Sequence, residues 1–328
     1  MSKRGRMLAF VALTAAALLS AVGYVAWSAL KTDAPPPVRP TSSALQLATA
    51  HKPYLVYQHV ARGPHYAEVA IAPIDQASAR PTFTGLVCER VYASAGKGIC
   101  LIPKQEPLGS AVNARLFGPD FRPTRSARLD GIASRARVSP SGRYGAATTF
   151  VTGHSYKDVG FSTKTSLIDM DAGKVLADLE KFAVTKDGKP FEAIDFNFWG
   201  VTFAPDDRRF YATLQTSGDI YLVEGDVEAR TARVIGKDVE CPSLSPDGSR
   251  IAYKLRNDGR WRLHVLDLAS GRRTPLSETR SIDDQVEWLD NERVLYGHLG
   301  DLWVARADGR GRPRVYLPNA LSPAVVRS

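Results

Sequence analysis

Ten polar or aromatic residues stand out because each lies in a segment between short apolar runs, where ligand-binding side chains gather in many folds. These residues are His65, Arg135, His154, Tyr156, Asn197, Trp199, Glu240, Trp261, Asp284 and Gln285. Together they offer guanidinium, imidazole, amide, carboxylate and aromatic groups, a mixture typical of a concave binding surface. We therefore predict that they line a binding site, provided that the fold brings them to one face.

Acidic residues in the same segments make an enzyme the alternative function. The acids concerned are Asp195, Glu240, Asp283 and Asp284, and two of them would have to meet as a hydrolase pair. A G-x-S-x-G motif is absent, since Gly160 to Lys164 ends on the wrong residue. The six histidines never fall at the spacing of paired metal ligands. We therefore expect a protein that is not an enzyme and has no cofactor or metal; the alternative is a hydrolase or lactonase.

A repeated pattern indicates the fold that must position these residues. Its copies span residues 137–146, 201–213, 242–254 and 285–297, with Pro140, Pro205, Pro246 and Leu289 in the equivalent turn position. In the clearest copy an apolar strand reaches Ser245-Pro246, Asp247-Gly248 makes a tight turn, and a second strand follows. Each copy belongs to a unit of four strands in about 40 residues, which is the size of one propeller blade.

Six such units fill residues 52–328. Units two to six cover residues 87–130, 134–180, 197–237, 241–277 and 284–318, and residues 181–198 are interpreted as an insertion. The first unit supplies only three strands, at residues 54–60, 67–74 and 81–86. We predict that Ala324 to Val326 completes it as the innermost strand, because a closed ring has no open sheet edge. The predicted fold class is all-β, a six-bladed β-propeller closed by its C-terminal strand.

An apolar segment at the N-terminus predicts export of the propeller. Three cations, Lys3, Arg4 and Arg6, precede a run without charges over residues 7–30. A run of this length spans a hydrocarbon core about 30 Å thick, and the leading positive charges hold the N-terminus in the cytoplasm. We therefore expect residues 1–31 to be a signal anchor or transmembrane helix in contact with inner-membrane lipid.

The localisation that follows is a single-pass membrane protein with an extracytoplasmic propeller. Cleavage near Ala26-Trp27-Ser28 is the alternative, and it would secrete the propeller. Residues 32–51, which include Asp33 to Ser43, are expected to form a proline-rich linker.

The segment Ser245 to Tyr253, with the pattern Ser-Pro-Asp-Gly-x-x-Ile-Ala-Tyr, resembles the PD40, or WD40-like, repeat of TolB propellers. Weaker copies lie at residues 137–146 and 201–213, and the resemblance covers roughly residues 52–328. The resemblance implies a TolB-like propeller in the cell envelope, similar to TolB-like envelope proteins of actinobacteria. We expect the N-terminal α/β domain of TolB to be lacking, so the role of TolB at the outer membrane does not carry over.

In a propeller, the loops between blades and the loops between second and third strands share one face, which we call the top face. The ten residues fall in these loops, so we expect the top face to bind an envelope protein, a peptide or a cell-wall component. Net charge is +9 without a run of five like charges, and nucleic acid is therefore not expected. We expect the protein to act as a monomer.

Cysteine usage is consistent with an exported protein. Cys88 and Cys100 lie on strands that the repeat places side by side, a few residues out of direct register. Because exported cysteines are commonly bridged, we expect a disulfide between these two and none at Cys241.

Overall fold

The computed structural model describes residues 40–50, 52–76, 80–106, 109–151 and 162–327, together with Gly5, Met7, residues 13–20 and Gly23. The chain divides into two units, Met1–Pro37 and Val38–Ser328. In the first unit residues 13–20 are helical. Within the described part of the chain, no helix is both long and apolar enough to cross a membrane. Most of the expected anchor, residues 1–31, lies outside the described residues.

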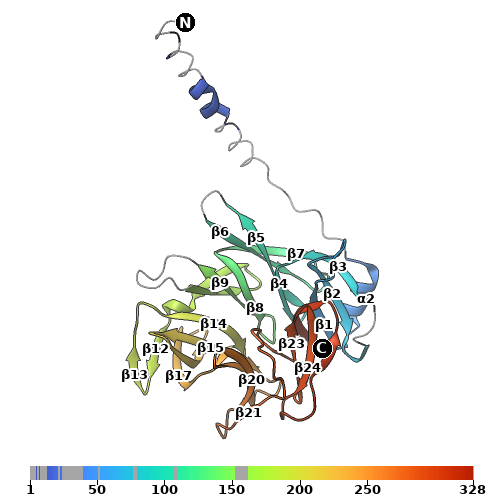
Figure 1. Cartoon of the computed structure of the whole chain (residues 1–328), viewed down its shortest axis with the longest axis vertical. Helices are drawn as coiled ribbons and strands as arrows, with labels where there is room; N and C mark the ends of the chain where they lie inside the picture. Colours follow the sequence, from blue (N-terminus) through green and yellow to red (C-terminus); the bar gives the residue numbers. More distant parts are fainter. Residues whose placement is uncertain are drawn as a thin grey trace. The chain divides into compact units, whose positions relative to one another are not determined.

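The second unit is a propeller of six sheets, which Figure 1 shows in succession around the ring. Blade two consists of β4 (Arg90–Ser94), β5 (Lys97–Gln105), β6 (Ser110–Phe117) and β7 (Pro123–Asp130). Blade three consists of β8 (Ile132–Val138), β9 (Tyr144–Val151), β10 (Ser162–Asp169) and β11 (Lys174–Asp178). Blade five consists of β18 (Glu240–Leu244), β19 (Arg250–Asn257), β20 (Arg260–Asp267) and β21 (Arg273–Pro275). Blade six consists of β22 (Glu287–Trp288), β23 (Arg293–His298), β24 (Asp301–Arg306) and β25 (Arg314–Leu317).

Blade one joins the two ends of the propeller unit. Its strands from the centre outward are β26 (Ala320–Val326), β1 (Tyr54–His59), β2 (Glu68–Pro73) and β3 (Thr82–Val87). β26 pairs antiparallel with β1, with Tyr54 opposite Val326 and Val56 opposite Ala324. The strand predicted at Ala324 to Val326 is therefore present and closes the ring.

Apolar cores lie between the blades, which explains why the central strands are apolar on both faces. In β1, the residues from Tyr54 to Gln58 are all buried, because neighbouring blades cover both faces of the strand. One core combines Val56 of blade one with Val91 of blade two, and another combines Leu167 of blade three with Phe210 of blade four. Burial of such side chains contributes about 1.5–3 kcal/mol each, so packing between blades is a main source of stability.

Blade four has two additional strands that the sequence did not predict. Its four regular strands are β14 (Asn197–Phe203), β15 (Arg209–Thr216), β16 (Asp219–Asp226) and β17 (Thr231–Lys237). After the 3₁₀ turn η2 (Leu179–Lys181), the insertion forms a hairpin of β12 (Ala183–Lys186) and β13 (Lys189–Phe191). β12 pairs in parallel with β17, so the insertion widens blade four to six strands and covers its outer edge.

A short helix, α2 (Ser42–Thr49), precedes blade one. The Thr41 hydroxyl accepts a hydrogen bond from the backbone N–H of Ala44 and donates one to the carbonyl oxygen of Phe83 in β3. Ala44 is fully buried against the core of blades one and two. The linker predicted over residues 32–51 therefore ends in a helix that packs on the propeller, a correction that the N-cap at Thr41 explains. A second 3₁₀ turn, η1 (Ile74–Gln76), follows β2.

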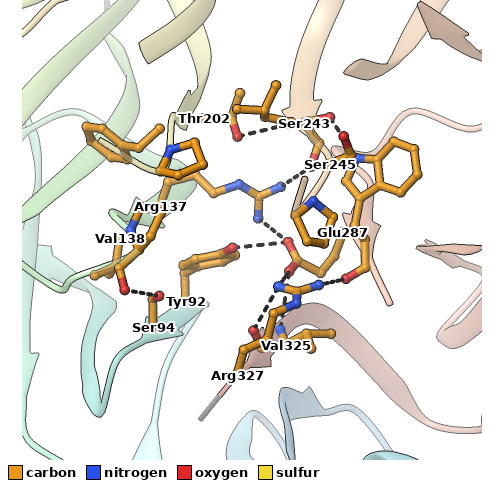
Figure 2. Close-up of a pocket in the computed structure, with 16 residues that line it drawn as sticks. Tyr92, Ser94, Arg137, Val138, Thr202, Ser243, Ser245, Glu287, Val325 and Arg327 are labelled. Carbon is orange, nitrogen blue, oxygen red and sulfur yellow. Dashed lines mark hydrogen bonds and ion pairs between the residues drawn. The ribbon is translucent and has the colours of Figure 1, made fainter. Parts of the chain in front are cut away.

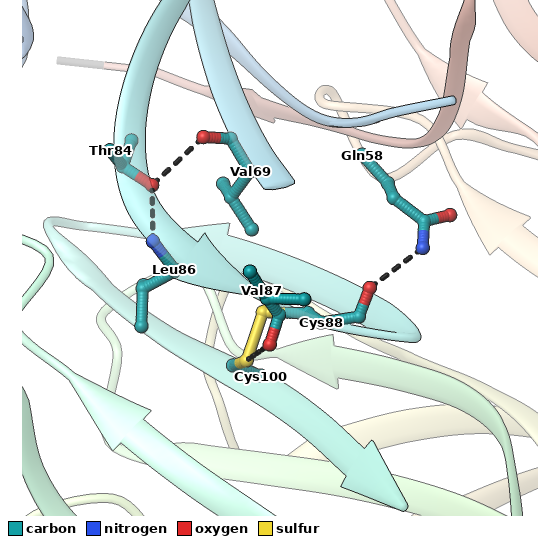
Figure 3. Close-up of a disulfide and its surroundings, with 7 residues drawn as sticks. All are labelled: Gln58, Val69, Thr84, Leu86, Val87, Cys88 and Cys100. Atoms are coloured by element: carbon teal, nitrogen blue, oxygen red, sulfur yellow. Dashed lines mark hydrogen bonds between the residues drawn. A yellow bond between two sulfur atoms is a disulfide. The ribbon is translucent and has the colours of Figure 1, made fainter. Parts of the chain in front are cut away.

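A disulfide joins Cys88, in the connection between blades one and two, to Cys100 in β5 (Figure 3), with Cα atoms 5.3 Å apart. In the sheet, Cys100 of β5 lies opposite Val91 of β4. Cys88 lies just before β4 begins, so the bridge reaches from β5 to the residue pair that precedes the neighbouring strand. The carbonyl oxygen of Cys88 accepts a hydrogen bond from Gln58 Nε2 at 2.6 Å. The bridge thus holds the crossing between the first two blades. Cys241 is buried and forms no disulfide.

The turn of blade six corrects the repeat alignment. In three repeats the residue before the proline donates its backbone N–H across the turn, from Ser139 to Tyr144, from Ala204 to Arg209 and from Ser245 to Arg250. In blade six the corresponding bond runs from Leu289 to Arg293, across a turn one residue shorter. The prediction that Leu289 takes the place of the prolines is therefore wrong, because Leu289 corresponds to Ser245.

Candidate functional site

The corrected register places four side chains at one level of the channel, where the inner strands of the blades face each other. These residues are Arg137, Thr202, Ser243 and Glu287, and all four line the same pocket. Arg137 comes from blade three and Glu287 from blade six, which are opposite blades of the ring. Their side chains meet at 3.3 Å, with 7% and 4% of their surfaces exposed. A buried ion pair therefore crosses the channel (Figure 2).

Glu287 also receives contacts from blades one and two (Figure 2). The Tyr92 hydroxyl donates a hydrogen bond to its Oε2 at 3.1 Å, and the Val325 backbone N–H donates one to its Oε1 at 3.3 Å. The Arg137 guanidinium lies over the Tyr92 ring, 4.4 Å from its centre. One carboxylate thus binds groups from three other blades, as a buried charge requires.

This layer separates two openings of the channel. Tyr92 and Arg137 line both the pocket where the inner strands begin and the pocket where they end. The first pocket includes Arg90, Arg135, Asp284 and Gln285, and it is the mouth on the top face. The second pocket includes the turn residues Pro140, Pro205 and Pro246, and it lies on the opposite face, which we call the bottom face.

At the mouth, charges are less buried and less fully paired. Arg135 Nη2 lies 3.8 Å from Asp284 Oδ1, and the two side chains are 20% and 25% exposed. Asp284 also accepts backbone N–H bonds from Gln285 and Gly297. Arg90 donates its Nε–H to the carbonyl oxygen of Ser134 at 2.9 Å. The Nε atom of Arg135 is buried and has no hydrogen-bond partner within the described part of the chain.

A second charged group extends the mouth into blade five. Lys254 forms an ion pair with Asp283 and lies over the Trp261 ring, 4.2 Å from its centre. Glu240 is 8% exposed. Burial raises the pKa of Glu240 to about 7, assisted by the nearby negative charge of Asp283 and opposed by Lys254. This carboxyl is therefore partly protonated near neutral pH.

The structure thus brings five of the ten predicted residues into one region. Arg135, Asp284 and Gln285 line the mouth directly. Glu240 and Trp261 belong to the adjoining group around Lys254. Gln285 is 5% exposed and donates hydrogen bonds to the carbonyl oxygens of Val201 and Pro242, so its amide holds blades together.

The remaining predicted residues have other positions. His65 pairs with Glu68 at 2.7 Å and stacks on Phe83 of the outermost strand β3, so it lies apart from the mouth. Trp199 is partly buried in the inner strand β14. His154 and Tyr156 lie outside the described residues.

Asn197 belongs to a separate pocket of about 340 Å³ beside the insertion of blade four. Its side-chain oxygen accepts the backbone N–H of Thr163, and its amide donates to the carbonyl oxygen of Asp195. Asp195 itself accepts hydrogen bonds from Thr216 and the Ser217 backbone. Asp195 therefore lies with Asn197 and does not meet the acids of the mouth.

Several side chains of the candidate site were not predicted from the sequence. Arg90, Tyr92 and Lys254 were not selected, and Arg137 and Glu287 were noted only as parts of the repeat. The signal that could have found the last two is their equivalence: one repeat position carries an arginine in unit three and a glutamate in unit six. The error at Leu289 concealed this equivalence by displacing unit six by one residue.

Comparison with known proteins places the fold. No protein-family model matches the chain, and no curated protein matches its sequence. Among solved structures, TolB from Acinetobacter baumannii is similar with a TM-score of 0.59 and 17% identity, over 86% of this chain and 70% of that one. A chain in the nidogen/laminin complex has a TM-score of 0.52 at 10% identity, over 83% of this chain and 98% of that one. An oligogalacturonate lyase in complex with manganese has a TM-score of 0.48 at 11% identity, over 76% of this chain and 70% of that one. At these identities the likeness shows the fold alone, a TolB-like six-bladed propeller.

Proposed function

We propose that this chain is a non-catalytic binding protein whose mouth on the top face holds an envelope protein, a peptide or a cell-wall component. The observation that carries the proposal is the composition of the mouth. Arg90 and Arg135 line the mouth together with a single acid, Asp284, so guanidinium groups are in excess there. Guanidinium groups of this kind bind carboxylates and peptide carbonyls.

The acids near the mouth support binding better than hydrolysis. Asp284 is held by two backbone N–H groups, and Asp283 is held by Lys254. A hydrolase needs two carboxylates directed at one substrate bond, whereas these acids are directed at their own partners. Within the described residues, no three His, Cys, Asp or Glu side chains gather as metal ligands.

The test is capture of partners by the mouth. Chemical crosslinking in membranes, followed by quantitative mass spectrometry, compares the unchanged protein with Arg135→Gln and with Arg122→Gln. Arg122 is a matched control because its side chain is 68% exposed at the outer turn of blade two. We expect Arg135→Gln to reduce capture roughly tenfold, as loss of a charged hydrogen bond does. Equal capture by both variants, at unchanged melting temperature, would refute the proposal.

We also propose that the propeller is extracytoplasmic and is held at the membrane by residues 1–31. The Cys88–Cys100 disulfide supports this location, because such bonds persist in oxidising compartments. The experiment is mass spectrometry of unreduced protein from fractionated cells. We expect the intact N-terminus and a bridged Cys88–Cys100 peptide in the membrane fraction; reduced cysteines in a cytoplasmic fraction would contradict the proposal.

A further inference from the structure

The pocket on the bottom face has no part in the proposed function. Figure 2 shows the residues that line it. The pocket has a volume of about 180 Å³ and lies where the inner strands end, whereas the mouth lies where they begin. This volume is below the range of roughly 300–1,000 Å³ that holds drug-sized ligands. A compact small molecule would therefore fill it.

The charged side chains that line this pocket leave one positive charge in excess. They are Arg137, Arg327 and Glu287, so two guanidinium groups share one carboxylate. Arg137 lies 3.3 Å from Glu287, whereas Arg327 Nη1 lies 3.9 Å from it. The Arg327 side chain is 39% exposed and donates to the carbonyl oxygen of Trp288 at 2.5 Å. The excess charge thus resides mainly on Arg327, at the opening.

Of the acids at the rim, Asp206 and Asp247 are paired with arginines of their own turns, whereas Asp207 forms no ion pair among the described residues. Asp206 pairs with Arg209 at 2.6 Å, and Asp247 lies 4.0 Å from Arg250. Asp207 accepts a hydrogen bond from the backbone of Ser141. An anion that enters the pocket would meet Arg327 before any unpaired carboxylate of the lining.

The walls beside Arg327 are apolar and also offer hydroxyl groups. Phe203, Leu244 and Trp288 line the pocket together with the prolines of the turns. The Thr202 hydroxyl accepts the Leu244 backbone N–H and can still donate its own proton. A small molecule with a carboxylate on an apolar ring would fit this lining, because the carboxylate can bind the arginine and the hydroxyl groups while the ring contacts the apolar side chains.

We infer that the bottom pocket is a second ligand site, which binds a compact monocarboxylic acid through Arg327 while its apolar body packs on Leu244 and the turn prolines. The acid enters from the face opposite the mouth. The Arg137–Glu287 layer stays intact beneath it, so occupancy of this site does not depend on a ligand at the mouth.

Benzoate is the probe, and saturation-transfer NMR titration of the full chain is the measurement. We expect benzoate to bind with a Kd of about a millimolar, and benzamide and benzylamine to bind roughly tenfold more weakly or not at all. Equal binding of benzoate and benzamide, or no binding of benzoate, would overturn the inference.

Variants locate the site. Arg327→Gln should weaken benzoate binding roughly tenfold, whereas Arg312→Gln, an exposed arginine outside the pocket lining, should leave it unchanged. Leu244→Trp fills the pocket without altering its charge and should abolish benzoate binding. This variant keeps the site testable if Arg327→Gln impairs folding. Arg135→Gln should not affect benzoate; if it did, the acid would be binding at the mouth and this inference would fail while the proposed function stood.

Discussion

Two arginine–carboxylate pairs cross the same channel between blades three and six, yet their surroundings differ. The Arg137–Glu287 pair is almost fully buried and receives hydrogen bonds from the inner strands of blades one and two. The Arg135–Asp284 pair, at the mouth, is longer by half an ångström, 3.8 Å against 3.3 Å, and is several times more exposed. One pair is thus fixed as part of the fold, while the other remains accessible to a ligand. Four predictions test this contrast.

Removal of residues 321–328 should have the largest effect. The deletion removes most of β26, and with it the Val325 backbone N–H and Arg327, both of which contact Glu287. It exposes the apolar edge of β1 and breaks the ring, so we expect loss of the cooperative unfolding transition. Circular dichroism during thermal denaturation is the measurement, and deletion of residues 1–37, the separate N-terminal unit, is the control. A truncated protein that melts normally as a monomer would contradict ring closure by this strand.

Glu287→Gln should reduce the free energy of unfolding by about 3–5 kcal/mol, because Arg137 would then be a buried charge without its counter-ion. Equilibrium urea denaturation measures the change. The double variant Arg137→Met/Glu287→Met should recover much of the loss, since replacing both partners removes the uncompensated charge. If Glu287→Gln costs less than 1 kcal/mol, the lower pair is not the structural element described above.

Stability should also depend on the protonation of Glu240. Its folded-state pKa of about 7 exceeds the ordinary value of 4.5, so folding favours the protonated form. The contribution is complete below pH 4.5 and is lost as the pH rises through 7, and the loss is at most about 3 kcal/mol. Glu240→Gln should flatten this part of the curve in denaturation experiments across that range. The remaining slope would come from Glu180, whose pKa burial raises to about 8; an unchanged curve would show that Glu240 titrates normally.

Asp284→Asn should have the smallest effect on stability, about 1 kcal/mol or less. Its side chain is 25% exposed, and asparagine retains an acceptor for the Gly297 N–H. Measured in the same urea series as Glu287→Gln, it provides the direct contrast between the two layers. A loss as large as that of Glu287→Gln would mean that the mouth is structural too.

Repeat chemistry explains how much of the fold could be predicted. Proline at the end of an inner strand and glycine or aspartate in the turn mark blades three, four and five locally, and the spacing of these blades allowed the others to be placed. The closing role of Ala324 to Val326 followed from the missing strand of blade one. The hairpin at residues 183–191 did not follow, because its pairing with β17 in parallel depends on contacts distant in sequence.

The site was predicted only in part for a similar reason. The positions of Arg135 and Asp284 in predicted loops correctly placed them near the mouth. A loop position does not tell how far a side chain lies from the central channel. His65 accordingly lies at the outermost strand of its blade. Side chains that face the channel are set by strand register, in which a shift of one residue reverses the facing side. The misplaced Leu289 therefore concealed Glu287, whose partner is 150 residues distant in sequence.

Ring closure by β26 also sets the order of events during biosynthesis. Every other strand of the propeller is synthesised before residues 320–326, and until then blade one lacks its innermost strand. During the same interval the carboxylate of Glu287 lacks the hydrogen bond from the Val325 backbone N–H. The propeller of the nascent chain therefore stays open, and the inner edge of β1 stays unpaired until synthesis is almost complete. A chaperone that binds nascent chains would have to protect this edge of β1 longer than any other strand edge.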